Sequence, residues 1–302
     1  MEYFLGVDVG GTNVKFGMVS SEGELLDKRK YPTATLREDG DFVKDFIDIM
    51  GQELKAHDHV RKVGIGVPGM ISKDRLYTVE MANLPELNNA PLIPALQEAF
   101  PSIEFHLEND PNAAALGELY FSTGDVPDTF LFITLGTGVG SAAVIDRQIF
   151  KGGRGNAMEF GHAISGSGNT VEHEIGKPGL VRMAQQLIDD GMESSLAEKE
   201  EINAKRLVKA ATKGDPVGVE VFRRGGYILG QGLVSALRIL DINTIIIGGG
   251  VAKTFELILD PMKEGLSAYL SSYYMDELDI RMASLANEAG IIGAASLCFV
   301  KE

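Results

Sequence analysis

The sequence of 302 residues has one cysteine and no long apolar run, and each of these shortages excludes a class of protein. A lone cysteine, Cys298, excludes an internal disulfide and a zinc site built from several cysteines, which fits a reducing compartment. The longest apolar stretches, such as 130–135 and 291–300, are too short to cross a membrane. The first residues show no basic targeting segment, so we expect a cytoplasmic protein without membrane partners.

Basic residues are also scarce relative to acidic ones. The chain has 28 Lys and Arg against 43 Asp and Glu, a net charge of −15. This charge repels phosphate backbones and anionic lipid surfaces, so no nucleic-acid partner is expected. The apolar fraction of 44% and charged fraction of 24% are typical of a globular protein. A chain of this length forms about two domains, and we therefore expect two lobes.

Glycine, by contrast, is abundant, with 36 copies that gather at the ends of apolar runs. The clusters lie at residues 9–12, 67–69, 135–140 and 248–250. The first and third follow similar strand-like stretches, and each leads into another such stretch, 14–19 and 141–145. A glycine-turn hairpin repeated about half a chain apart predicts a duplicated architecture, and two unrelated hairpins are the alternative.

Strand and helix patterns alternate along the rest of the chain. Helical spacing of apolar residues marks 41–54, 91–100, 221–240 and 288–300, and strand patterns mark 63–67, 103–107 and 244–247. This alternation predicts an α/β fold. The charged stretch 193–201 is interpreted as a solvated helix end or loop.

Two of the glycine turns have the composition of phosphate-binding loops. Residues 8–12 place an acidic side chain, two glycines and a hydroxyl after a strand, so backbone N–H groups can meet phosphate oxygens while Asp8 holds hydrated Mg²⁺. No Walker motif is present, and residues 135–140 lack the spacing of a dinucleotide fingerprint. Because tight turns also need glycine, a purely structural role remains open for each turn.

Residues 108–118, which read ENDPNAAALGE, allow two roles for Asp110. Followed by Pro111 and an alanine-rich run, Asp110 is a good helix N-cap. It also follows a strand, where open α/β sheets gather ligands, and a carboxylate there can accept a proton from an attacking hydroxyl. The residues by themselves leave both roles open.

Residues 155–162, which read GNAMEFGH, hold a second candidate pair. Glu159 and His162 are three residues apart between glycines and can both point toward hydroxyl groups of a ligand. With Glu172, His173 and Glu174 nearby, a metal site is the competing interpretation, although no H-E-x-x-H motif or cysteine pair supports it.

Taken in order, these segments resemble the ROK family of sugar kinases, within the wider sugar kinase, heat-shock ATPase and actin superfamily. The segments that carry the resemblance are 5–15 and 134–140 (first and second phosphate motifs), 65–69 and 83–85 (beside the sugar), 108–118 (catalytic stretch) and 155–162. The resemblance implies an α/β fold of two ribonuclease-H-like, actin-like ATPase lobes, with mixed sheets flanked by helices and a ligand cleft between them. The smaller lobe would comprise residues 1–121 and 288–302, and the larger lobe residues 122–287.

The resemblance also implies an ATP-dependent hexose kinase that transfers the γ-phosphoryl group of Mg-ATP to a sugar hydroxyl, with Asp110 as general base. Glucose O6 is the expected acceptor, and N-acetylmannosamine, N-acetylglucosamine, allose and fructose are the alternatives. The implied sugar-binding residues are Gly69, Asn83, Asn109, Asp110, Glu159, His162 and Glu172. The implied nucleotide-binding residues are Asp8, Gly10, Gly11, Thr12, Lys15, Gly136, Thr137, Gly138, Gly248, Gly249 and Gly250, with Asp8 acting on Mg²⁺ through water. Glu172 is preferred to Glu174 because its distance from Leu180 matches the family spacing.

One segment departs from the family pattern. Many members carry a C-x-C-G-x-x-G-C zinc loop after the histidine, whereas residues 163–171 of this chain read AISGSGNTV. We therefore expect no structural zinc and an ordinary hydrogen-bonding role for His162. The resemblance further implies a homodimer. A sugar-responsive regulator of the same family is the alternative from another class, and it would need a DNA-binding module before the phosphate motif, which here begins at Leu5.

Overall fold

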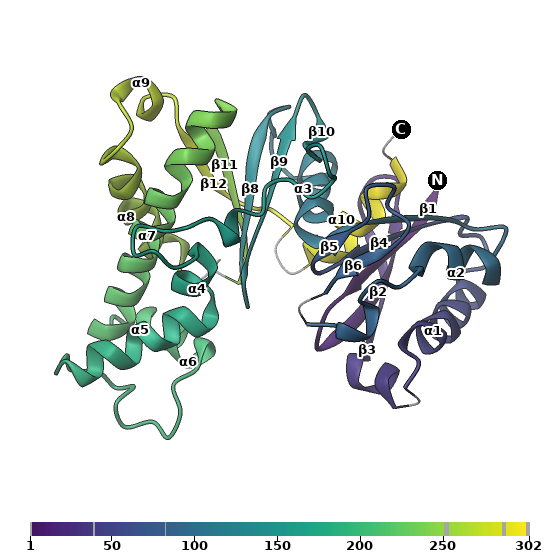
Figure 1. Cartoon of the computed structure of the whole chain (residues 1–302), viewed down its shortest axis with the longest axis horizontal. Helices are drawn as coiled ribbons and strands as arrows, with labels where there is room; N and C mark the ends of the chain where they lie inside the picture. The colour runs from purple at the N-terminus through teal and green to yellow at the C-terminus, as the bar shows by residue number, and fades with distance from the viewer. Residues whose placement is uncertain (1, 39, 82, 251–253, 286–287, 300–302) are drawn as a thin grey trace. The chain divides into compact units, whose positions relative to one another are not determined.

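The computed structural model describes residues 2–38, 40–81, 83–250, 254–285 and 288–299. It divides into two compact units (Figure 1). Unit 1 comprises Met1–Asp128, Ala142–Met158 and Ser284–Glu302, and unit 2 comprises Thr129–Ser141 and Glu159–Ala283. The functional lobe boundaries expected from the sequence stay a prediction.

The first sheet has the order β3-β2-β1-β4-β7. Its strands are β1 (Tyr3–Val9), β2 (Asn13–Ser20), β3 (Leu25–Pro32), β4 (Lys62–Val67) and β7 (Glu104–Asn109). Strands β1, β2 and β3 are joined antiparallel, whereas β1, β4 and β7 run parallel. The register places Asp8, Gly66 and Glu108 in one row across the parallel strands. A short hairpin, β5 (Met70–Ile71) with β6 (Thr78–Glu80), follows β4.

Residue alternation along β1 explains how helices cover both faces of this sheet. Leu5, Val7 and Val9 join a large core with Phe46 of α1 (Phe42–Ala56). Phe4, on the opposite face, packs with Ile291 of α10 (Ala289–Ser296). Successive side chains of a strand point to opposite faces, and each buried large side chain contributes about 1.5–3 kcal/mol, so both layers stabilise the sheet. Unit 1 also contains α2 (Leu92–Ala99) and α3 (Asp110–Phe121).

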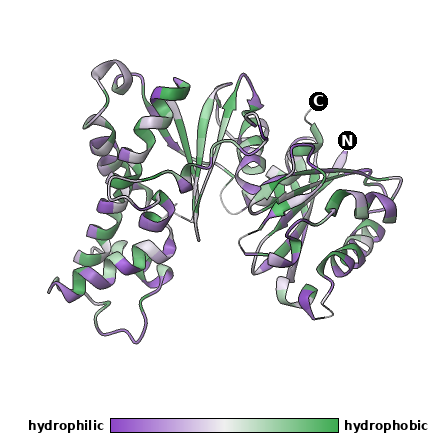
Figure 2. Cartoon of the chain, in the orientation of Figure 1, coloured by the Kyte–Doolittle hydropathy of each residue, from purple (hydrophilic) through white to green (hydrophobic). Residues whose placement is uncertain are grey.

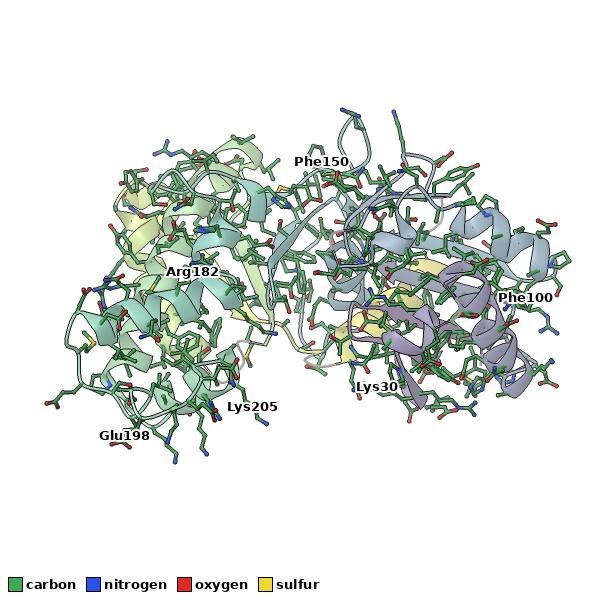
Figure 3. All side chains as sticks on the ribbon, turned by 60° about the horizontal axis from the view of Figure 1, so that its bottom comes forward. Lys30, Phe100, Phe150, Arg182, Glu198 and Lys205 are labelled. Carbon is green, nitrogen blue, oxygen red and sulfur yellow. The ribbon has the colours of Figure 1, made fainter. Side chains whose placement is uncertain are left out.

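The second sheet repeats the plan of the first. Its strands are β8 (Phe130–Leu135), β9 (Val139–Ile145), β10 (Gln148–Ile149), β11 (Thr244–Gly249) and β12 (Asp279–Met282), in the order β10-β9-β8-β11-β12. Numbered within each sheet, both orders read third, second, first, fourth, fifth, which confirms the predicted duplication. Strands β8 and β11 run parallel and are mostly hydrophobic in Figure 2, as expected for strands buried on both faces. The boundary between the units falls within β9.

Unit 2 is otherwise helical. Its helices are α4 (Val171–Ile175), α5 (Lys177–Asp189), α6 (Ala204–Ala211), α7 (Pro216–Leu240), α8 (Phe255–Ser267) and α9 (Ser272–Met275). The longest, α7, starts at Asp215, whose carboxylate accepts the Gly218 N–H, and its apolar residues are buried at helical spacing. The stretch 193–201 is an exposed loop, as predicted.

The predicted elements agree with the structure apart from their ends. Single 3₁₀ turns add η1 (Thr33–Arg37), η2 (Pro85–Leu87), η3 (Phe160–His162) and η5 (Leu297–Phe299). The last helix was expected over 288–300, but α10 ends at Ser296 and the tighter turn η5 follows, while Val300 lies outside the described residues. Among the described residues, no helix combines the length and the apolar character needed to cross a membrane.

Candidate functional site

The carboxyl ends of β1, β4 and β7 bring together the candidate residues of unit 1. Because the three strands are parallel, the glycine turn after β1, Gly69 after β4 and Asp110 after β7 share one edge of the sheet. A Cβ atom built on Gly66 would lie 3.8 Å from the Cα of Asp110. The backbone of Asp110 therefore lies close to Gly66 of β4, the residue that pairs with Asp8.

The turn at residues 10–12 is fixed by its own hydrogen bonds. The Gly10 N–H donates to the Asn13 carbonyl at 3.0 Å, and the Gly10 carbonyl accepts the Thr33 hydroxyl at 2.6 Å. Thr12 is exposed, so its hydroxyl can reach a ligand. A Cβ on Gly11 would lie 3.0 Å from the Cβ of Asn83. The structure thus places a predicted phosphate turn beside a predicted sugar-binding amide.

Asp8 and Lys15 face each other across the β1–β2 hairpin. Their carboxylate and ammonium groups are 2.6 Å apart, with side chains 19% and 34% exposed. Both are therefore accessible to a charged ligand at this edge. A partly exposed carboxylate is the donor type that Mg²⁺ takes, commonly through retained waters, so the residues present fit the predicted ion.

The amide of Asn109 links two of these turns. Its Nδ2 donates to the Gly69 carbonyl at 2.9 Å, and Gly69 has a φ of +109°, a backbone region that favours glycine. Asn109 is the N-cap of α3, and Asp110 is its first residue. The prediction of Asp110 as the N-cap is therefore wrong by one position, because the helix begins directly after β7, one residue earlier than Pro111 suggested.

In unit 2, the turn at residues 136–138 is supported by α4 and α5. The Gly136 N–H donates to the Gly138 carbonyl at 2.9 Å, and the Lys177 N–H lies 3.3 Å from the carbonyls of Gly136 and Thr137. The Glu172 carboxylate accepts the Val139 N–H at 2.9 Å, and a Cβ on Gly138 would overlap that carboxylate. Glu172 thus braces the second phosphate turn, a contact that the sequence did not predict. Its sugar-binding role stays a prediction.

Glu159 and His162 also lie in unit 2, with a carboxylate oxygen of Glu159 4.0 Å from Nε2 of His162 and side chains 40% and 64% exposed. Partial burial raises the pKa of Glu159, the His162 charge lowers it, and the Glu172 carboxylate raises it further. The three predicted sugar-binding residues of this unit are therefore close enough to interact electrostatically. Glu174, in contrast, accepts hydrogen bonds from Ser167 and Asn169 at the surface, and these bonds lower its pKa.

The predicted adenosine segment, residues 248–250, is hydrogen-bonded to the residue that precedes the turn at 136–138. The Gly250 N–H donates to the Leu135 carbonyl at 2.8 Å, and Gly249 has a φ of +87°. Beside it lies a mostly apolar cavity, whose lining includes Gly136, Ile175, Lys177, Leu180, Leu207, Phe222, Leu229, Gly250 and Ile258. A flat apolar base is the kind of group that such walls accommodate.

Sequence reasoning missed three side chains around these segments. Lys177 starts α5 beside the second phosphate turn, Asn156 forms two hydrogen bonds with the backbone of Ile71, and Arg75 forms an ion pair with Glu108. Asn156 stands inside a motif that was recognised, so its position carried a signal. Arg75 carried none, because its partner is 33 residues away in the sequence.

Comparison with known proteins identifies the family. The model of the ROK family matches residues 4–300. The chain belongs to the ROK family. Glucokinase from Halalkalibacterium halodurans is 31% identical over 315 residues, which cover 98% of this chain and 94% of the relative. This similarity along the whole chain supports a hexose kinase.

Solved structures of similar proteins support the same family assignment. A structure from Cytophaga hutchinsonii, provisionally described as a sugar kinase, is 38% identical with a TM-score of 0.91 and covers 99% of this chain and all of that one. A ROK family glucokinase from Streptomyces griseus, solved with glucose and AMPPNP, is 30% identical with a TM-score of 0.81, and 98% of each chain is covered. The predicted fold class is confirmed. Regulators also match: a xylose repressor from Caldicellulosiruptor bescii is 25% identical, and the match covers 97% of this chain and 77% of the repressor.

Proposed function

We propose that this ROK protein transfers the γ-phosphoryl group of ATP to O6 of glucose, with Asp110 as the general base. The observation that carries the proposal is the arrangement at one sheet edge of unit 1: the Asp8–Lys15 pair, the Gly10–Thr12 turn with Asn83 against it, and the Asn109–Asp110 step. The glucokinase relatives support the choice of a hexose, because they match the chain along its whole length.

The chemistry asks for positioned groups more than for covalent participation by the protein. The sugar hydroxyl oxygen forms a bond to the γ-phosphorus as the bond from that phosphorus to the β–γ bridging oxygen breaks, and ADP leaves. The Asp110 carboxylate takes the hydroxyl proton. Lys15 and the N–H groups of Gly11 and Thr12 stabilise the negative charge on the phosphate, and Mg²⁺, when bound near Asp8, would supply further neutralisation of that charge.

Ring hydroxyls need fixed donors and acceptors. Asn109 is held by its bond to the Gly69 carbonyl, so its amide is preorganised, and Asn83 lies beside Gly11 of the first glycine turn. Glu159, His162 and Glu172 are proposed as further hydroxyl partners. A substrate that lacks a hydroxyl, or presents it on the other ring face, leaves such groups unpaired, which is how one hexose is selected over another.

The test measures ADP release from Mg-ATP with glucose, mannose, allose, fructose, N-acetylglucosamine and N-acetylmannosamine. Glucose is expected to give the highest kcat/KM. Asp110→Asn should lower kcat by about 10²–10⁴-fold, because an amide of nearly equal volume cannot accept the proton. Asp58→Asn, at a side chain 94% exposed, is the matched control and should leave the rate unchanged.

The outcomes separate the alternatives. Fast turnover of another sugar would correct the substrate and keep the mechanism. Near-normal turnover by Asp110→Asn would reduce Asp110 to a structural residue. A sugar that raises the melting temperature without any ADP release would favour the regulatory function suggested by the repressor match.

A further inference from the structure

Arg75 adopts a backbone conformation that its residue type disfavours. It lies in the turn between β5 and β6 with a φ of +60°, in the left-handed region. This region is sterically disfavoured for a residue with a Cβ and is readily adopted by glycine. The turn is closed by the Ser72 N–H, which donates to the Tyr77 carbonyl at 2.8 Å, and by the Arg75 N–H, which donates to the Ser72 carbonyl at 2.9 Å. Glycine would fit this turn better, so the contacts of the turn do not explain an arginine at this position.

The guanidinium group of Arg75 is largely buried, with the side chain 12% exposed. Its Nε donates to the Glu108 carboxylate at 3.1 Å, and its Nη2 donates to the Gly155 carbonyl at 2.7 Å. Its Nη1 lies 3.3 Å from the Ser72 carbonyl. All of these partners belong to unit 1, and they come from three segments far apart in the sequence.

Glu108 connects Arg75 to the backbone on either side of the proposed general base. Its side chain is 4% exposed, and both carboxylate oxygens are used. While Oε2 faces Arg75, Oε1 accepts the Asn109 N–H at 3.0 Å and the Asn112 Nδ2–H at 3.1 Å. These two donors lie on either side of Asp110, at the N-cap and in the first turn of α3. Glu108 therefore fixes the backbone that carries Asp110, and Arg75 fixes Glu108.

The Gly155 contact ties the same guanidinium to the GNA segment. Gly155 has a φ of +94°, and a Cβ built on it would lie 2.5 Å from Nη1 of Arg75. The glycine thus gives the guanidinium room to reach the carbonyl. The next residue, Asn156, is anchored to Ile71 by hydrogen bonds of 3.1 and 2.9 Å, so the segment is docked on the hairpin that carries Arg75.

We propose that Arg75 is a positioning residue, which acts through Glu108 to hold the Asn109–Asp110 step in its catalytic geometry; this rests on the proposed function. A buried carboxylate that loses its cation either keeps an uncompensated charge or rearranges. Either change moves the helix start that carries the base, and a displacement of about 1 Å can cost about 10²-fold in rate.

The test compares two arginines in the same backbone region. Arg147 also has a positive φ, +64°, but its side chain is 49% exposed and pairs with Asp128 at the surface. Arg75→Gly and Arg147→Gly both relieve the backbone cost, so they differ in the side-chain contacts that are lost. Arg75→Gly should lower kcat at least tenfold at a temperature where it is fully folded, with KM for ATP within about twofold of the wild type. Arg147→Gly should keep both constants.

Arg75→Lys supplies the conservative comparison. It keeps the charge and loses the planar fork that reaches Glu108 and Gly155 together, so its kcat should lie between those of wild type and Arg75→Gly. If Arg75→Gly does not fold, Arg75→Lys alone decides, because wild-type kcat for this variant would overturn the proposal. Equal kcat values for Arg75→Gly, Arg147→Gly and wild type would also overturn it and reduce Arg75 to a structural ion pair.

A readout without turnover separates this proposal from the proposed function. Hydrogen exchange of the peptide that contains the Asn109 and Asn112 amides should be faster in Arg75→Gly than in wild type and Arg147→Gly, because Glu108 is released. An inactive wild type with this exchange pattern would reject the kinase function and keep the Arg75–Glu108 linkage. If the wild type is an active kinase and Arg75→Gly keeps wild-type exchange and kcat, the kinase function is supported and the positioning role of Arg75 is rejected.

Discussion

Single residues in this protein serve the fold and the proposed chemistry from neighbouring positions. Asn109 occupies the N-cap position of α3, but its amide donates to the Gly69 carbonyl and does not cap the helix, and Asp110 is the first helical residue. Glu172 accepts the Val139 N–H beside the predicted second phosphate turn and also raises the pKa of Glu159. A residue chosen for one role thus constrains the group beside it, and substitutions at such positions should change stability and binding together.

Glu159 provides a test at this scale. Its pKa is raised, first by burial and then by Glu172, so the folded state binds its proton more tightly than the unfolded chain does. Its stability contribution is therefore greatest below the ordinary pKa of 4.5 and falls as the pH rises through the raised value. Glu159→Gln removes this titration, and it should raise the melting temperature relative to wild type at pH 7.5 more than at pH 4.

The control for Glu159 is Glu174→Gln, because hydrogen bonds lower the pKa of Glu174 and its ionised form stabilises the fold. This variant should lose stability at pH 7.5 relative to wild type, the opposite sign. A melting temperature that changes equally at both pH values in Glu159→Gln would contradict the assigned shift. Sugar binding by Glu159→Gln, measured calorimetrically, is expected to weaken.

At the scale of elements, the layers of unit 1 depend on close approach between α10 and the first sheet. A Cβ on Gly64 of β4 would lie 1.7 Å from the Ala294 carbonyl oxygen, and one on Gly6 of β1 would lie 2.1 Å from that of Ile291. Helix and strand backbones touch at these points. The start of α10 reaches Asp8 in the same way, since a Cβ on Gly290 would lie 2.6 Å from the carboxylate. The packing of α10 therefore determines the position of the sheet edge that is predicted to bind phosphate.

Gly64→Ala is expected to destabilise the protein by about 2–3 kcal/mol, because a backbone oxygen cannot move aside without shifting the helix. Gly51→Ala in α1 is the matched control: its Cβ would meet only Phe100, at 3.4 Å, and alanine favours a helix interior by about 0.5–1 kcal/mol. Urea unfolding measures both. Equal stability of Gly64→Ala and wild type would show that α10 tolerates a larger separation from β4.

At the scale of the whole molecule, the net charge of −15 opposes association between copies, yet the family resemblance implies a homodimer. We expect light scattering to give twice the mass of the chain. Added salt should favour the dimer, because it screens repulsion over a Debye length of about 10 Å at 0.1 M and less above that. A single-chain mass at 0.5 M salt and at the highest soluble concentration would contradict this prediction.

The sequence by itself determined the class of fold, the duplication and most of the candidate positions. These depend on local patterns: apolar runs ending in glycine, helical spacing in 41–54, and short motifs such as residues 108–118, in which the order of residues carries the chemistry. The ends of elements were less predictable. The start of α3 at Asp110 and the early end of α10 depend on packing with neighbours, which no local pattern encodes.

Only the tertiary structure decided which distant residues meet. The Arg75–Glu108 pair, the brace from Glu172 to Val139 and the contact of Gly64 with Ala294 join segments separated by 33 residues or more. The sequence around each of these residues does not indicate which distant residue it contacts. Their roles arise because the parallel strands β1, β4 and β7 end at one edge of the sheet and because α10, from the end of the chain, packs on strands from its beginning. The fold therefore decides which charged groups pair and which backbones touch.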